Sequence, residues 1–302
     1  MRSMDKETRL KLAVQKSGRL TDPSLDLLAR CGLKLSRGKD QLVGFGENMP
    51  LDVLYVRDDD IPDLVQEDVC DLGLVGLNVL EERRLELAAR GAQARFETLR
   101  TLDFGRCRLS LAVPEGATWA GAASLRGRRI ATTYPYTLTR YLRERDIEAE
   151  IVTLSGAVEI APRLGRADLI CDLVSTGSTL QANHLREVET VLESHAVLIR
   201  TPVELPQAKD EWVQRLLMRI DGVEQVKESK YIMLHAPRAA LPAIRRLLPG
   251  SESPTIIPLE GTQDLVAVHA VCRENVFWET LESLKAAGAS SVLVLPVEKM
   301  LA

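Results

Sequence analysis

The chain contains the stretch Asp168-Leu169-Ile170-Cys171-Asp172-Leu173-Val174-Ser175-Thr176-Gly177-Ser178-Thr179-Leu180, which indicates its fold class. The first half is an apolar run, which predicts a buried strand. Small hydroxylated residues around Gly177 then predict a turn, and a helix is expected after it. A strand followed by a turn and a helix is the repeating unit of a mostly parallel α/β sheet.

The turn also has the composition of a phosphate site. Its backbone N–H groups would point into one concavity at the start of a helix, where the dipole and the free donors favour an anion. Asp168 and Asp172 are four residues apart, so on a strand they are expected on one face, where an acid suits ribose hydroxyls. The alternative is an ordinary helix capped by Ser or Thr, which binds no ligand. The residues predicted to hold the ligand are Asp168, Asp172, Ser175, Thr176, Gly177, Ser178 and Thr179.

The alternation of strands and helices continues on both sides of this stretch and predicts two α/β lobes with a ligand cleft between them. Residues 1–101 and 195–226 are assigned to lobe I, because a strand at 196–200 is expected to return to it. Residues 102–194 are assigned to lobe II. The other expected strands are 10–15, 52–56, 71–76, 108–113, 129–132, 150–153 and 168–174, and the expected helices include one capped by Asp22, one capped by Asp58-Asp59-Asp60, 135–145 and 156–164.

The pattern changes near residue 227. Strands are expected at 231–235, 255–259, 265–271 and 291–295, and helices at 239–248 and 274–287. The resulting order, β-α-β-β-α-β, is the ferredoxin-like arrangement. The predicted fold class is therefore α/β, with a two-lobed part like that of periplasmic binding proteins and a ferredoxin-like C-terminal domain at 227–302.

Composition limits the classes of function. The chain has 302 residues, of which 45% are hydrophobic and 27% charged, as expected for two or three globular domains. A net charge of -4 argues against a nucleic-acid partner. The five scattered cysteines predict reduced core thiols and no metal site. Residues 1–11 are charged and no long apolar run follows, so we expect no membrane association and a cytoplasmic location.

Ordered motifs along nearly the whole chain resemble those of the long, histidine-regulated form of the ATP phosphoribosyltransferases. In the commonest phosphoribosyltransferases two adjacent acids precede the loop that binds phosphoribosyl pyrophosphate (PRPP), whereas here Cys171 takes the first position and Asp172 the second. The other matching motifs are Gln15-Lys16-Ser17-Gly18-Arg19-Leu20, Glu47-Asn48-Met49-Pro50, Arg57-Asp58-Asp59-Asp60-Ile61-Pro62, Asp71-Leu72-Gly73, Leu102-Asp103-Phe104-Gly105, Arg129-Ile130-Ala131-Thr132, Gly156-Ala157-Val158-Glu159-Ile160-Ala161-Pro162, Ser229-Lys230-Tyr231 and Val297-Glu298-Lys299-Met300.

The resemblance implies the first step of histidine biosynthesis, in which adenine N1 of ATP attacks C1 of PRPP to give phosphoribosyl-ATP and pyrophosphate. It also implies Mg2+ as cofactor, which should be held mainly by substrate phosphates without a dedicated protein cage. Histidine is expected to bind the C-terminal domain as a feedback inhibitor, with Ala289 and Ser290 as the residues suggested for its site. Long-form members assemble as hexamers with dimeric forms, so a homo-oligomer is expected.

Cationic residues after the first strand are candidates for the pyrophosphate of PRPP. Lys16 and Arg19 would hold that group and stabilise it as it leaves, while Gly18 permits close backbone approach. Arg57 is expected to face the same cleft. The alternatives are a solvated loop charge for Lys16 and Arg19, and a helix-capping salt bridge with Asp58-Asp59-Asp60 for Arg57.

Five further positions carry weaker predictions. Asp71 and Gly73 are assigned to the ATP pocket, and Glu159 to ribose or metal, although an acid in the first turn of a helix often only answers the dipole. Tyr134 and Tyr136 would stack on adenine or simply pack, and packing is favoured.

Two other classes of protein compete with this interpretation. A two-lobed solute-binding protein has the same kind of lobes, but it needs no loop such as 172–179. A salvage phosphoribosyltransferase that acts on a free base would have the second acid and would lack the appended domain.

Overall fold

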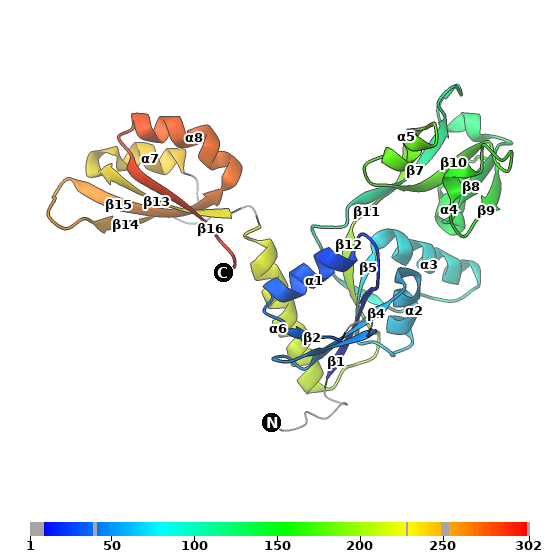
Figure 1. Ribbon diagram of the computed structural model, residues 1–302, viewed down its shortest axis with the longest axis horizontal. Helices are drawn as coiled ribbons and strands as arrows, with labels where there is room; N and C mark the ends of the chain where they lie inside the picture. Colours follow the sequence, from blue (N-terminus) through cyan, green and yellow to red (C-terminus); the bar gives the residue numbers. More distant parts are fainter. Residues whose placement is uncertain (1–8, 39–40, 228, 249–253, 301–302) are drawn as a thin grey trace. The chain divides into compact units, whose positions relative to one another are not determined.

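The computed structural model describes residues 9–38, 41–227, 229–248 and 254–300 (Figure 1). The chain divides into two compact units, residues 1–213 and 214–302. Most of the N-terminal segment on which the cytoplasmic expectation depends lies outside the described residues. No helix among the described residues is long and apolar enough to cross a membrane.

Lobe I is built on a seven-stranded sheet of order β2-β3-β4-β1-β5-β12-β6. β1 pairs in parallel with β4 and β5, whereas β12 is antiparallel to β5 and β6. The strands are β1 (Leu10–Gln15), β2 (Leu35–Ser36), β3 (Val43–Gly46), β4 (Leu51–Val56), β5 (Leu72–Gly76), β6 (Glu97–Thr101) and β12 (Ala196–Arg200). The helices are α1 (Thr21–Arg30), the 3-10 turn η2 (Asp58–Asp60), α2 (Ile61–Gln66) and α3 (Leu77–Ala89).

Lobe II is built on a second sheet of order β11-β7-β10-β8-β9. β10, β8 and β9 are parallel, and β7 is antiparallel to both β10 and β11. The strands are β7 (Cys107–Pro114), β8 (Arg129–Thr132), β9 (Glu150–Thr153), β10 (Leu169–Val174) and β11 (Leu185–Ser194). The helices are η3 (Ala122–Leu125), α4 (Pro135–Glu144), η4 (Val158–Ile160) and α5 (Ser178–Ala182).

The chain passes between these two sheets twice, once from β6 to β7 and once from β11 to β12. Each sheet has its own apolar core, which includes Ala13, Ile61 and Val75 in lobe I and Leu109, Ile130 and Leu169 in lobe II. Two cores joined by two short crossings produce the two-lobed architecture expected from the sequence. The exact residue boundaries of the three predicted parts stay a prediction.

The C-terminal unit has a four-stranded antiparallel sheet of order β14-β15-β13-β16. The helix α6 (Gln207–Glu224) leads into β13 (Ser229–Pro237), η5 (Arg238–Ala240), α7 (Leu241–Leu247), β14 (Thr255–Pro258), β15 (Leu265–Arg273), α8 (Glu274–Ala286) and β16 (Ser290–Pro296). α7 and α8 lie together on one face of the sheet (Figure 1), over a core that includes Ile232, Leu234 and Val268. The ferredoxin-like prediction is therefore confirmed.

Two local predictions are wrong. Segment 156–164 forms only the short 3-10 turn η4 instead of a helix. Ala157 has a φ of 50°, which delays the start of the turn, and Pro162 has no N–H to bond the carbonyl of Val158. Asp22 does not cap α1, because that helix starts at Thr21 with Leu20 as its cap residue. Asp22 instead lies in the first turn, where its negative charge interacts favourably with the positive end of the helix dipole.

Candidate functional site

The carboxyl ends of the parallel strands define one edge on each lobe. In lobe I the ends of β1, β4 and β5 lead into Lys16, Arg57 and the start of α3. In lobe II the ends of β8, β9 and β10 lead into the start of α4, the turn η4 and α5. Ligands of open α/β sheets bind at such edges, because the loops and the helix N-termini face outward there.

A cleft of about 600 Å3 opens between these two edges. Lobe I contributes the loop after β4 and one side of α3, and lobe II contributes the segments after β8 and β9. Both lobes therefore line a single space of the size that small-molecule ligands occupy. Residues that line it include Arg57, Asp58, Asp59, Glu82, Tyr134 and Tyr136.

The turn after β10 has the shape of an anion cradle. Gly177 adopts the left-handed conformation with φ 83° and ψ 0°, which lets the chain turn sharply into α5. The hydroxyls of Thr176 and Ser178 are 3.1 Å apart, and the side chains of Ser175 and Thr179 are exposed. Within the described residues, the N–H groups of Thr176, Gly177 and Ser178 donate no turn or loop backbone hydrogen bond, so they are available to a ligand.

Asp172 stands near the carboxyl end of β10, just before this turn. It is partly buried, and one of its oxygens accepts a hydrogen bond of 2.8 Å from the N–H of Leu173. The pKa of Asp172 is raised to about 6, mainly because the carboxyl group has lost solvent. The hydrogen bond from Leu173 acts in the opposite direction, and the nearby charge of Glu159 adds to the rise. Among the described residues no cation pairs with Asp172. A desolvated acid without a cationic partner is typical of a ligand site.

Asp168 lies at the opposite end of the same strand. Its carboxylate accepts hydrogen bonds from the backbone N–H of Arg129 at 2.8 Å and from the Arg129 guanidinium at 3.1 Å. The backbone hydrogen bond is the main reason why the pKa of Asp168 is lowered, and burial acts against it. Asp168 thus joins β10 to β8, far along the strand from the turn, and this geometry favours a structural role over the predicted contact with PRPP.

Lys16 and Arg19 differ in their surroundings. The side chain of Lys16 is exposed and makes no ion pair in the described part of the chain. Arg19 donates to the carbonyl of Gly105 at 2.7 Å and to the side-chain oxygen of Asn78 at 2.9 Å, which fixes its guanidinium beside the lobe crossing. Gly18 has a φ of 137°, and a Cβ there would lie 2.6 Å from the Gln15 side chain, so a larger residue would disturb this turn.

Arg57 is the predicted cation that lines the cleft. Its side chain is exposed, and no ion pair with its acidic neighbours is found in the described residues. The pKa of Asp59 is raised by loss of solvent and by Asp58 and Asp60, while Arg57 acts in the other direction. The capping salt bridge considered for Arg57 is therefore not formed, and its guanidinium is free to meet an anion.

Asp71 and Gly73 are engaged at the other end of lobe I. Asp71 is buried and accepts hydrogen bonds from Lys209 Nζ at 2.8 and 3.0 Å and from the N–H of Lys11 at 2.7 Å. A Cβ on Gly73 would lie 2.6 Å from Ile61 Cγ2, so this glycine permits α2 to pack on β5. Both positions are at the start of β5, away from the cleft, and their geometry favours structure over the predicted ATP contact.

Sequence reasoning gave no role to Asn78 and Glu82, which connect the lobes at the cleft. Asn78 donates from Nδ2 to the Tyr134 hydroxyl at 2.9 Å. Glu82 accepts hydrogen bonds from the N–H groups of Tyr136 and Thr137 at the start of α4, and burial raises its pKa while these bonds lower it. The partners are 54 to 56 residues apart, so no local pattern could have revealed these contacts.

Ala289 and Ser290 lie where α8 ends and β16 begins. Ala289 is buried and its N–H donates to the carbonyl of Leu284 at 2.9 Å, whereas Ser290 is exposed. This geometry gives neither residue a specific feature of a ligand site, and their predicted role in binding histidine stays a prediction.

The chain matches known families from residue 57 to residue 299, apart from a short gap. The family model described as ATP phosphoribosyltransferase matches residues 57–222, and the model described as HisG, C-terminal domain matches residues 227–299. One similar solved structure is the ATP phosphoribosyl transferase (HisG:HisZ) complex from Thermotoga maritima, with 27% identity and a TM-score of 0.57 over 70% of this chain and 98% of that one. Another is the alkanesulfonate-binding protein SsuA from Xanthomonas axonopodis pv. citri, with 15% identity and a TM-score of 0.47 over 71% of this chain and 72% of that one.

Proposed function

The chain belongs to the ATP phosphoribosyltransferase family, whose pentosyl transfer serves histidine biosynthesis, and we propose that its reaction takes place in the cleft between lobes I and II. In the proposed arrangement the turn 175–179 binds the 5-phosphate of PRPP and Asp172 binds the ribose hydroxyls. The observation that carries this assignment is that open N–H groups of that turn lie at the same strand end as Asp172, which is desolvated and has no cationic partner among the described residues.

Cationic side chains of lobe I would bind the pyrophosphate group of PRPP. Arg57 lines the cleft and Lys16 is exposed at the same sheet edge, so both are available to phosphate oxygens. Arg19 is held by Gly105 and Asn78, and a fixed guanidinium suits a group that must meet developing charge without rearrangement. Gly18 keeps the backbone of this loop close to such a ligand.

The acids of lobe II fit Mg2+ only in combination with the substrates. Glu159 is close enough to Asp172 for its charge to raise the pKa of Asp172. No group of three or more metal-ligating side chains occurs among the described residues. Mg2+ needs only one or two carboxylates when substrate phosphates and water complete its shell. Bound there, it would neutralise charge on the pyrophosphate.

The proposed chemistry needs no covalent help from the protein. Adenine N1 of ATP forms a bond to C1 of PRPP as the bond from C1 to the pyrophosphate oxygen breaks, and the electron pair leaves with pyrophosphate. The configuration at C1 inverts, and the transition state resembles an oxocarbenium ion. The protein would contribute orientation of two anions and stabilisation of the departing charge.

Histidine inhibition and a homo-oligomeric assembly, as a hexamer with dimeric forms, are proposed for the C-terminal domain. The match to the family's C-terminal domain supports a regulatory role. Its helices cover one face of the sheet, and Leu293 and Leu295 of β16 are 53% and 54% exposed. Such apolar side chains suit a contact between subunits.

A cytoplasmic location is also part of the proposal. All five cysteines are buried and free of disulfides. Free thiols in every core are typical of proteins that work in a reducing compartment.

Two assays test the proposal. Purified protein with ATP, PRPP and Mg2+ should produce phosphoribosyl-ATP, followed by ultraviolet absorbance, and added histidine should suppress it. Asp172→Ala should raise the KM for PRPP by about tenfold or more while the protein stays folded. Normal PRPP affinity and turnover in this variant would refute the assigned role of Asp172, and activity that histidine does not change would refute the regulatory one.

A further inference from the structure

Asn78 is a fully buried polar residue at the junction of the lobes. It is the second residue of α3, and its neighbours come from three other segments: the loop after β1, the end of β11 and the segment before α4. Its backbone N–H donates to the hydroxyl of Ser194 at 3.0 Å. All of its side-chain hydrogen-bonding atoms have partners, which is what burial of an amide requires.

The partners of Asn78 fix which way its amide points. The guanidinium of Arg19, which can only donate, lies 2.9 Å from one amide atom, and the hydroxyl of Ser194 donates to the same atom at 2.8 Å. Two donors converge on that atom, so it must be the oxygen. The opposite atom is then the NH2 group, and it donates to the hydroxyl of Tyr134 at 2.9 Å.

This orientation determines what the Tyr134 hydroxyl can do. Because its oxygen accepts from Asn78, its own hydrogen must go to another acceptor. No acceptor for it is found among the described residues, although Tyr134 lines the cleft. Burial raises the pKa of Tyr134, and the charges of Asp58, Asp59 and Asp172 raise it further, so the hydroxyl keeps its proton.

We propose that Tyr134 is a substrate-binding residue whose hydroxyl donates a hydrogen bond to a bound substrate, and that Asn78 is the positioning residue that holds it as a donor. The acceptor would be an oxygen or ring nitrogen of ATP or PRPP at the border between the two lobes. The inference rests on the proposed location of the substrates in this cleft. Tyr134 also packs against the apolar core of lobe II, so the proposal adds a binding role to the packing role that the sequence favoured.

Two single variants and their combination test the proposal in the full-length protein. Tyr134→Phe keeps the ring and removes the donor. Asn78→Asp keeps the acceptor for Arg19 and Ser194, but its second oxygen would accept the hydrogen of Tyr134 and withdraw it from the cleft. Each variant should lower kcat/KM by about tenfold, and a rise in the KM of either ATP or PRPP would identify the substrate that accepts the bond.

The double variant and a control separate binding from folding. If Asn78 acts through Tyr134, the double variant should lose no more activity than Tyr134→Phe alone. Tyr141→Phe removes a hydroxyl from α4, the helix that follows Tyr134, where it bonds Glu189 outside the cleft, and should keep kcat/KM within about twofold. Melting temperatures of all variants would be recorded beside the kinetics.

Each outcome is decisive. A Tyr134→Phe variant with unchanged kcat/KM for both substrates would overturn the proposal, whatever its melting temperature. Losses that multiply in the double variant would overturn the role of Asn78. Failure of the proposed function itself would look different, because the unmodified protein would then form no phosphoribosyl-ATP.

Discussion

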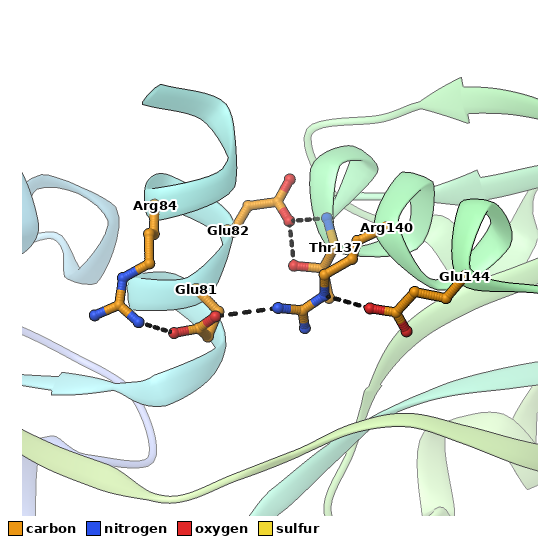
Figure 2. A network of polar contacts seen from close by, with 6 residues as sticks. All are labelled: Glu81, Glu82, Arg84, Thr137, Arg140 and Glu144. Atoms are coloured by element: carbon orange, nitrogen blue, oxygen red, sulfur yellow. Dashed lines mark hydrogen bonds and ion pairs between the residues drawn. The ribbon is translucent and has the colours of Figure 1, made fainter. Parts of the chain in front are cut away.

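Glu82 on α3 caps the helix α4 of the other lobe, with its carboxylate accepting from the Thr137 N–H at 2.8 Å and from the Thr137 hydroxyl at 2.6 Å (Figure 2). The backbone N–H of Tyr136 donates to the other oxygen at 2.8 Å. The first turn of a helix leaves such donors without partners, and here the partner comes from a different lobe. The cap therefore joins the lobes and also satisfies the N-terminus of a helix.

Glu82→Ala should lower the free energy of unfolding by about 1–2 kcal/mol, because it leaves two amides and a hydroxyl without an acceptor. Denaturant unfolding of the ligand-free protein would measure this. Glu144→Ala is the matched control from the same network, since Glu144 is 60% exposed and lies 3.9 Å from Arg140 (Figure 2). Its effect should stay below about 0.5 kcal/mol, and equal effects of the two variants would contradict the capping role.

Asp172→Asn should stabilise the ligand-free protein at neutral pH while impairing PRPP use. The pKa of Asp172 is raised from 3.8 to about 6, so its contribution to stability is present below pH 3.8 and is lost as the pH rises through 6. Asparagine does not ionise, and above pH 6 the variant should gain at most about 3 kcal/mol. Urea unfolding between pH 4 and pH 8 would measure the gain, which should shrink toward pH 4. A variant less stable than the parent at pH 8 would contradict this account.

Asp168→Asn makes the same chemical change on the same strand and should do the reverse. The pKa of Asp168 is lowered in the folded protein, so its carboxylate stabilises the fold at pH values above the pKa of the unfolded chain. This stabilisation is lost as the pH falls through the pKa of the folded protein. Its side chain is 30% exposed, and the loss at pH 7 should be no more than about 1 kcal/mol. The KM for PRPP should not change. A raised KM at unchanged stability would restore the ligand role that the sequence suggested.

Asp71→Asn should destabilise the fold without changing the KM for ATP. The carboxylate of Asp71 and the ammonium of Lys209 form an ion pair with exposures of 6% and 13%, so removal of one charge leaves the other poorly compensated. The free energy of unfolding should fall by about 2–4 kcal/mol. Steady-state kinetics at a temperature where the variant is folded should give an unchanged KM for ATP, and a raised KM would support the predicted ATP contact instead.

Several strands of this fold follow closely from local sequence. The strands expected at 129–132, 150–153 and 196–200 coincide with β8, β9 and β12. The sequence does not predict β11, because its apolar residues Leu185, Val188, Val191 and Leu192 are spaced as on a helix. The structure explains that spacing, since register irregularities at Glu187/Glu189 and Thr190/Leu192 interrupt the alternation expected of a strand.

The site was predictable only where its chemistry is local. The small residues around Gly177 and the preceding Asp172 form a continuous motif, and the sequence placed them together. Strand alternation, however, assigns a residue to a face and not to an end of the strand, so it could not separate Asp168 from Asp172. Asn78 and Tyr134 lie on different lobes, 56 residues apart in the chain, and nothing in the sequence near either residue indicates the other.

β5 connects two polar centres of the molecule. Before its first residue, Asp71 holds Lys209 near the start of α6, the helix that continues toward the C-terminal domain. Just beyond its last residue, Asn78 holds Arg19 and Tyr134 at the cleft. Only the five buried residues of one strand and Leu77 separate these two centres along the chain. A displacement of Lys209 would therefore be transmitted to Asn78 through the stiffness of β5, so the ion pair at one end of the strand and the hydrogen bonds at the other are mechanically linked.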